Sequence, residues 1–172
     1  MNNLRISLVL FFIISGCTTV EFAINDRTDG QKYGSWDYIS DFDEFRGRYL
    51  LSMVKSEDGL GTIRVITFKN SNEHWFEIKN GDSYICIVDY SIPIKFKFIK
   101  GNQEEIIDDY FYGLTNRSGL MTTNAAEVHN YVQWLNHADK VIIRTTDDCG
   151  NTIDKSFLIQ GKTHLRPVLS ES

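Results

Sequence analysis

Ile94-Lys95-Phe96-Lys97-Phe98 is the stretch that decides the fold of this chain. Apolar and charged residues alternate here without a break, and successive side chains of a β-strand point to opposite faces of a sheet. One face of the stretch is therefore apolar and the other carries lysines. The pattern predicts a half-buried strand with Lys95 and Lys97 in solvent.

The same two-residue period recurs along most of the chain, and turn signals such as Asn80-Gly81-Asp82 separate the runs. Short strands at a spacing of roughly ten residues are typical of an antiparallel β-sandwich or barrel-like domain. Tyr84 to Val88 is apolar on both faces, which predicts a central strand covered on two sides. The other predicted strands are Tyr49 to Val54, Thr62 to Lys69, His74 to Ile78, Ile106 to Tyr112, Lys140 to Thr145 and Lys155 to Ile159, and the central strand lies within Ser83 to Tyr90.

One helix interrupts the strand pattern. Asn124 followed by Glu127 resembles a capping box, which marks the start of a helix. Four apolar residues follow at the spacing of one helix face: Val128, Tyr131, Val132 and Leu135. The sequence predicts a helix from about Asn124 to His137 that plugs the core with Tyr131, Trp134 or Leu135.

The first residues have the layout of an export signal. Arg5 and the amino terminus give a positive start, Ile6 to Ile14 is apolar apart from Ser7, and Ser15-Gly16-Cys17 follows. This is the layout of a secretory signal, and the run is shorter than the about 20 apolar residues that span a bilayer as a helix. An ordinary cleavable signal and a short buried helix are the alternatives.

The stretch resembles the bacterial lipoprotein signal, in which a small residue and then Gly or Ala precede a modified cysteine. Ile14 stands where that signal commonly has Leu. The resemblance implies that the thiol of Cys17 carries diacylglycerol, that cleavage occurs before it, and that its new amino group is acylated. Two or three acyl chains anchor a protein stably in a lipid bilayer. Thr18 is not the Asp that tends to keep such proteins in the inner membrane, so the resemblance favours an outer membrane location facing the periplasm.

These predictions divide the chain into four parts, and its length suits one folded domain. Trp36 to Phe45 interleaves aromatic and acidic residues and is compatible with either a strand or a helical turn. The parts are a lipoprotein signal peptide over residues 1–16, a lipidated N-terminus and tether over 17–35, a β-sandwich domain over 36–165 and a C-terminal tail over 166–172.

The charge balance is acidic, with 23 acidic and 18 basic side chains and a formal net charge of −5. Nucleic-acid binding needs clusters of Lys and Arg, so the composition argues against a nucleic-acid partner. Two further cysteines, Cys86 and Cys149, accompany Cys17. In an exported protein such a pair predicts a disulfide, and two buried free thiols are the alternative.

No catalytic or metal-binding motif stands out in the sequence. Two pairs of adjacent carboxylates, Asp108-Asp109 and Asp147-Asp148, could serve general acid–base chemistry, but adjacent residues of a strand face opposite sides. The histidines are scattered, which favours surface or hydrogen-bonded roles over metal ligation. We therefore predict neither a metal nor a cofactor, and no catalytic residue. The histidines are His74, His129, His137 and His164.

The expected function is that of a non-enzymatic, membrane-anchored envelope lipoprotein whose β-sandwich domain binds another envelope component, a protein or a glycan. One alternative is an exclusion, immunity or inhibitor lipoprotein, and another is a glycan or peptidoglycan hydrolase that uses the paired Asp residues. Aromatic residues are the candidates for the binding surface, with core packing as the alternative. These candidates are Trp36, Trp75, Tyr110 and Tyr112.

Overall fold

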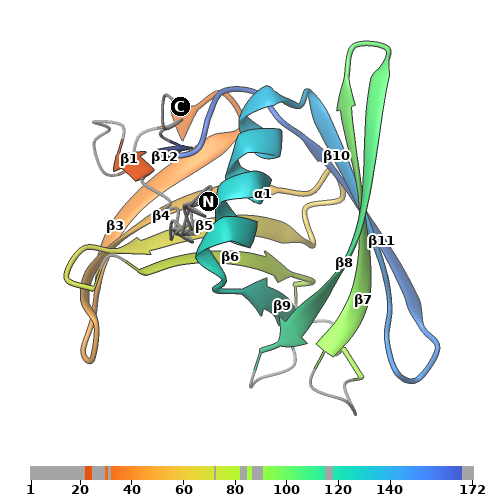
Figure 1. The fold of residues 1–172 in the computed structure, drawn as a ribbon, viewed down its shortest axis with the longest axis horizontal. Coiled ribbons are helices and arrows are strands. Elements are labelled where there is room, and N and C mark those ends of the chain that lie inside the picture. The colour runs from red at the N-terminus through yellow and green to blue at the C-terminus, as the bar shows by residue number, and fades with distance from the viewer. Residues whose placement is uncertain are drawn as a thin grey trace, which may run out of the picture.

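The computed structural model describes residues 22–24, 30, 32–71, 73–81, 85–86, 91–114 and 118–167. It confirms the predicted class: the described chain is mainly antiparallel β-structure with a single helix (Figure 1). The strands are β1 (Phe22–Ile24), β2 (Lys32–Tyr33), β3 (Trp36–Asp43), β4 (Gly47–Lys55), β5 (Thr62–Phe68), β6 (Glu73–Lys79), β7 (Ser91–Lys100), β8 (Gln103–Gly113), β9 (Gly119–Thr122), β10 (Lys140–Thr146), β11 (Thr152–Leu158) and β12 (Leu165–Pro167), and the helix is α1 (Ala125–His137).

Ten strands form one sheet in the order β11-β10-β7-β8-β9-β6-β5-β4-β3-β2, and β1 pairs with β12 separately. The large sheet curves strongly, so that β3 to β6 run across one side of α1 and β7, β8, β10 and β11 stand beside it (Figure 1). The helix contacts β6, β7 and β12. The two layers that enclose the core are therefore two halves of one sheet.

The edge strand β11 is tied to the other half of this sheet. The Glu57 backbone N–H, in the turn after β4, donates to the Ser156 carbonyl of β11 over 2.7 Å. Beside it, the Lys155 ammonium forms a 2.6 Å ion pair with Asp58. These bonds bring the turn between β4 and β5 against the edge strand β11, which makes the domain barrel-like and covers part of an otherwise exposed edge.

A second contact joins the turn between β2 and β3 to the segment after β11, and it requires glycine at position 34. The Ser35 backbone N–H donates to the Gln160 carbonyl over 2.8 Å, so the turn between β2 and β3 lies directly on the segment after β11. Gly34 in that turn has a φ of +65°, and a Cβ atom there would lie 2.1 Å from the Gln160 carbonyl oxygen. Both the backbone conformation and the space therefore require glycine at this position.

Helix α1 begins as the sequence predicts. The Asn124 side chain accepts hydrogen bonds from the backbone N–H groups of Ala126 and Glu127, at 3.0 and 3.3 Å. The Glu127 carboxylate accepts a hydrogen bond from the Thr122 hydroxyl, which ties the first turn to β9. The buried face of the helix is the predicted stripe of Val128, Tyr131, Val132 and Leu135.

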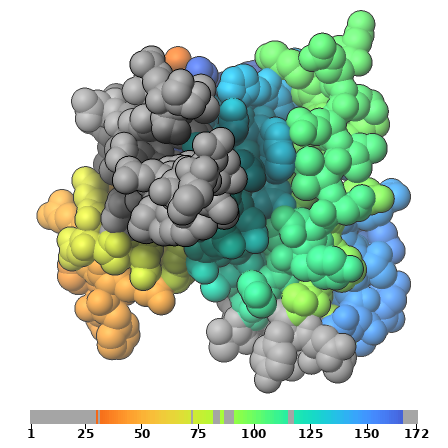
Figure 2. All heavy atoms as spheres, in the orientation of Figure 1, coloured from red at the N-terminus to blue at the C-terminus, as the bar shows by residue number. Residues whose placement is uncertain are grey.

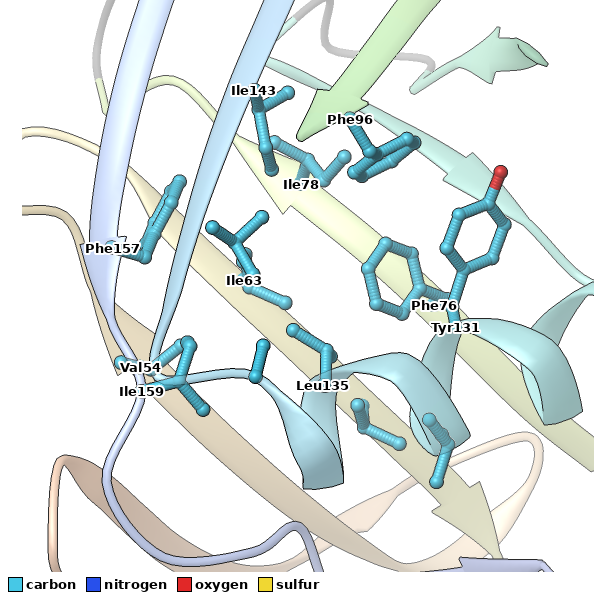
Figure 3. Packing of buried hydrophobic residues seen from close by; sticks show 14 of the residues in the cluster. Val54, Ile63, Phe76, Ile78, Phe96, Tyr131, Leu135, Ile143, Phe157 and Ile159 are labelled. Carbon is cyan, nitrogen blue, oxygen red and sulfur yellow. The ribbon is translucent and has the colours of Figure 1, made fainter. Parts of the chain in front are cut away.

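An aromatic cluster forms the centre of the core (Figure 3). The Phe76 ring of β6 stacks on Tyr131 of α1 at 4.9 Å between ring centroids, and Phe96 of β7 lies 4.8 Å from the same tyrosine ring. Phe111 of β8 completes the cluster at 5.3 Å from Tyr131. Burying each of these rings contributes about 2 to 3 kcal/mol, so the cluster joins both halves of the sheet to the helix.

One prediction about local structure needs correction. Ile85 and Cys86, the described part of the predicted central strand, lie outside any strand. The Cys86 N–H donates to the Asp147 carboxylate and its carbonyl accepts from the Asp148 N–H, so its backbone groups pair with the turn after β10 instead of a ladder. The predicted disulfide between Cys86 and Cys149 holds this contact together.

The predicted tether and tail contain strands. β1 and β2 lie within residues 17–35, and β1 pairs with β12, which extends two residues beyond the predicted end of the domain at residue 165. Trp36 to Asp43, for which the sequence left strand and helical turn open, is strand β3. Cys17 and the rest of the predicted signal peptide lie outside the described residues, as do residues 168–172 of the predicted tail.

Candidate functional site

Two of the predicted binding residues project from one face of β8. Phe111 points into the core and is fully buried, so its neighbours Tyr110 and Tyr112 point to the outer face of the sheet. They expose 66% and 59% of their surface. Trp36 is fully buried in the core, so it forms no part of a binding surface and core packing is its role.

The outer face continues from β8 across β9 to β6. Tyr112 pairs with Met121, and Met121 pairs with Glu77, so these three side chains form one row. Trp75 lies two residues from Glu77 on β6 and therefore on the same face. The strand register thus unites three of the four predicted aromatic residues on one side of the sheet. We call this set, Trp75, Tyr110, Tyr112 and Met121, the outer aromatic surface.

Trp75 is held in place by a cation and a second ring. The Arg46 guanidinium lies 4.2 Å from the centroid of the Trp75 ring and 5.2 Å from that of Phe68. The two rings meet edge to face, with 4.8 Å between their centroids. A guanidinium over an indole contributes about 0.5 to 1 kcal/mol at an exposed site, so this end of the surface is preorganised.

The charges within the same face are paired. Arg64 of β5 and Glu77 of β6 lie directly opposite each other and form a 3.1 Å ion pair. The Glu77 side chain is only 8% exposed, so its charge is largely removed from solvent and neutralised by Arg64. A partner that covers Trp75 and Met121 would therefore meet an apolar surface without an uncompensated carboxylate at its centre.

Beside Tyr110 the face is hollowed by a shallow depression of about 370 Å³. Its polar groups are held by cross-strand ion pairs: Lys95 lies 3.2 Å from Asp108, and Arg144 makes a bidentate contact with Asp154 at 2.7 Å. This combination of an exposed tyrosine ring with fixed hydrogen-bonding groups is the composition of a recognition surface. The depression is lined by Pro93, Ile94, Lys95, Asp108, Asp109, Tyr110, Arg144 and Thr146.

The first predicted carboxylate pair is divided between the two faces of β8. Asp108 points outward to Lys95, whereas Asp109 points inward and accepts a 2.5 Å hydrogen bond from the Tyr131 hydroxyl. Burial and this hydrogen bond raise the pKa of Tyr131, so the hydroxyl stays protonated and donates. Asp109 thereby anchors the helix to the sheet.

The second pair lies in the turn between β10 and β11. Asp147 is buried, and its carboxylate accepts from the backbone N–H groups of Cys86, Cys149 and Asn151 and from the Asn151 side-chain amide. The Asn151 amide, with the three backbone donors, lowers the pKa of Asp147. A carboxylate bound by four donors is suited to holding the turn and the disulfide in place, which is a structural role.

Sequence reasoning missed a buried polar network that brings two histidines together. His164 Nδ1 lies 2.6 Å from the Ser52 hydroxyl, and His164 Nε2 lies 2.8 Å from the Thr67 hydroxyl. The same Thr67 oxygen lies 3.0 Å from His74 Nδ1. Because a hydroxyl carries one hydrogen, Thr67 can donate to at most one of the two imidazoles and must accept from at least one, which couples the two tautomers.

Burial determines the charge of this network. It lowers the pKa of His164 to about 3, with a further contribution from nearby His74, and it also lowers the pKa of His74. Both rings are therefore neutral near pH 7. Ser52, Thr67 and His164 are each at most 2% exposed, so the Ser–His contact stabilises the fold and has no access to a substrate.

No protein-family model matches this chain, and no curated protein or solved structure shows significant similarity to it. Within the described residues, no group of three or more His, Cys, Asp or Glu side chains could hold a metal ion. The helix of the described part is neither long nor apolar enough to cross a membrane. The outer aromatic surface is the candidate binding site on this face of the sheet.

Proposed function

We propose that this protein is a lipid-anchored envelope lipoprotein whose β-domain binds another envelope component, a protein or a glycan, through the outer aromatic surface. The observation that carries the proposal is the exposure of Tyr110 and Tyr112, since they expose 66% and 59% of their surface on the outer face of a sheet strand. Tyrosine and tryptophan are enriched where proteins bind partners, because each combines a large apolar ring with a polar group.

Anchoring is tested by changing the cysteine of the signal. Wild-type protein is expected to remain with membranes and to carry the mass of its acyl chains, whereas a Cys17→Ser variant loses both. Fractionation followed by mass spectrometry of the intact protein measures the two properties together. A Cys86→Ser, Cys149→Ser double variant is the matched control and should keep the acyl mass. Equal membrane association of the Cys17→Ser variant would remove the anchoring part of the proposal.

Binding is tested by photo-crosslinking in intact cells. A benzoylphenylalanine side chain in place of Tyr112 is expected to give a crosslinked product, because it would lie in the interface. The same group in place of Leu158, which is 48% exposed on β11, is the control outside the surface. A Tyr110→Ser, Tyr112→Ser double variant should reduce co-purification of the partner by about thirtyfold or more, since each lost aromatic anchor costs about 1 kcal/mol or more.

These substitutions should leave the fold intact, because exposed side chains contribute little to stability. The unfolding midpoint of the double variant in urea serves as the check. Crosslinking that is as strong from the Leu158 position as from the Tyr112 position would contradict the proposed surface. The identity of the crosslinked component would also distinguish an envelope protein from a glycan.

A further inference from the structure

A groove lies on a different part of the domain, between the tip of the β7–β8 hairpin and the C-terminal half of α1. The hairpin tip rises beside the end of the helix (Figure 1), and the two elements adjoin on the face shown in Figure 2. The groove has a volume of about 660 Å³, within the range of ligand and peptide sites. It is lined by Phe98, Ile99, Lys100, Gln103, Glu104, Glu105, Trp134, His137 and Ala138.

The floor of the groove is aromatic and partly accessible. The Trp134 ring lies 5.5 Å from the Phe98 ring and 5.5 Å from the Tyr131 ring, so packing fixes its orientation. Phe98 is buried beneath it, whereas Trp134 is only partly buried and presents part of its ring to the groove. The face of an indole ring carries negative potential and attracts cations.

The other groups of the groove also favour a cation. Two of its charged residues are already neutralised, since Lys100 pairs with Asp139 at 2.6 Å and Glu104 pairs with Lys97 at 2.7 Å. Glu105 stands opposite Phe98 in the ladder and has no ion-pair partner among the described residues. Its carboxylate therefore leaves the groove with a net negative charge.

The C-terminal end of α1 also favours a cation in the groove. The His137 Nδ1–H donates to the Gln133 carbonyl over 2.7 Å, so in the neutral ring Nε2 carries the lone pair and can accept a hydrogen bond. The groove also lies at the C-terminus of α1, where the helix dipole favours positive charge. The groove thus favours a cation through three features: the Trp134 ring, the Glu105 carboxylate and the C-terminus of α1.

We propose that this groove binds a lysine- or arginine-bearing peptide segment of a partner protein, with the cationic head between Glu105 and the Trp134 ring and neighbouring aliphatic side chains against Phe98 and Ala138. The side chain of lysine or arginine matches both properties of the groove, because an apolar stem carries the charge. This site is separate from the outer aromatic surface and does not depend on the function proposed for that surface.

The test uses the full chain purified from membranes in a non-ionic detergent. The probe is a fluorescein-labelled peptide, Leu-Lys-Leu-Lys-Leu, and binding is followed by fluorescence anisotropy at low ionic strength. Glu105→Gln is expected to weaken binding about fivefold and Glu105→Lys by about thirtyfold or more. Both substitutions are on an exposed residue and should leave the unfolding midpoint unchanged. The Leu-Glu-Leu-Glu-Leu peptide should show no measurable binding.

Glu44→Lys is the matched control, because Glu44 is exposed in the turn between β3 and β4 and the change in net charge is the same. It should bind the lysine peptide as the wild type does. If Glu44→Lys and Glu105→Lys weaken peptide binding equally, the peptide is attracted to the acidic protein as a whole, and the proposed site is overturned. Absence of binding of the lysine peptide to the wild type would also overturn it. A Tyr110→Ser, Tyr112→Ser variant should keep full affinity for the lysine peptide. The experiment therefore distinguishes a failure of the groove proposal from a failure of the binding function proposed for the outer aromatic surface.

Discussion

Acidification from about pH 6.5 to about pH 4.5 is expected to destabilise the folded chain by about 1.4 kcal/mol per pH unit through His164 alone. The pKa of this imidazole is lowered from 6.5 to about 3 in the folded state by burial and by His74. Between these values the unfolded chain binds a proton that the folded chain does not. Stability from this residue is therefore fully present above pH 6.5 and is lost as the pH falls.

Urea unfolding at a series of pH values measures this effect. A His164→Gln variant is expected to be less stable at pH 7, because it disturbs the bonds to Ser52 and Thr67, but its stability should fall less steeply between pH 6.5 and 4.5. Phe42→Ala, at an exposed residue that does not titrate, is the control and should keep the wild-type slope. The same slope in wild type and His164→Gln would refute the assignment. Carboxylates such as Asp147 contribute mainly below about pH 4, outside this window.

Replacing Phe76 with alanine is expected to lower the free energy of unfolding by about 3 to 5 kcal/mol. The Phe76 ring is fully buried and contacts rings on β7, β8 and α1, so its removal leaves a cavity where both halves of the sheet meet the helix. Since the surrounding rings come from three elements, they cannot all move inward to fill it. Calorimetry or urea unfolding measures the change.

Phe42→Ala is the matched control for this prediction, because the same ring is removed from a position that is 63% exposed near the end of β3. Its effect should be within about 0.5 kcal/mol. Replacement of Phe76 by leucine should lower the free energy of unfolding by an amount between those of Phe76→Ala and Phe42→Ala, since leucine fills most of the cavity. A loss of less than about 1 kcal/mol on Phe76→Ala would mean that the aromatic cluster does not carry the stability assigned to it.

Local sequence signals predicted the elements that depend on local contacts. The helix was predicted because its cap at Asn124 and its apolar stripe lie within one short segment, and the structure contains both. The strands from β4 onward were predicted for the same reason, except β9 and β12, whose four and three residues are too few to display a period. Ile85 was wrongly assigned to a strand because an apolar run does not distinguish a strand from a buried loop.

Long-range contacts could not be predicted in this way. Thr67 and His164 are 97 residues apart, and nothing in either segment signals that they meet. The groove beside Trp134 likewise arises from the packing of a hairpin tip against a helix end. Trp36 was open to a different approach, because it alternates with Tyr38 on one face of β3 and both are buried. Once the stretch is known to be a strand, this alternation places both residues on one face, whereas aromatic character alone does not separate a core residue from a surface residue.

If the chain is anchored at Cys17, as we propose, the pairing of β1 with β12 has a mechanical consequence. A pull from the membrane enters β1 at Phe22, which is paired with Pro167, whereas β12 is held to the domain at Leu165, which is paired with Ile24. The load therefore acts at opposite ends of the ladder and along the strands. Its hydrogen bonds are stretched together in shear instead of opening one after another, so this short ladder resists tension at the one place where tension would arrive.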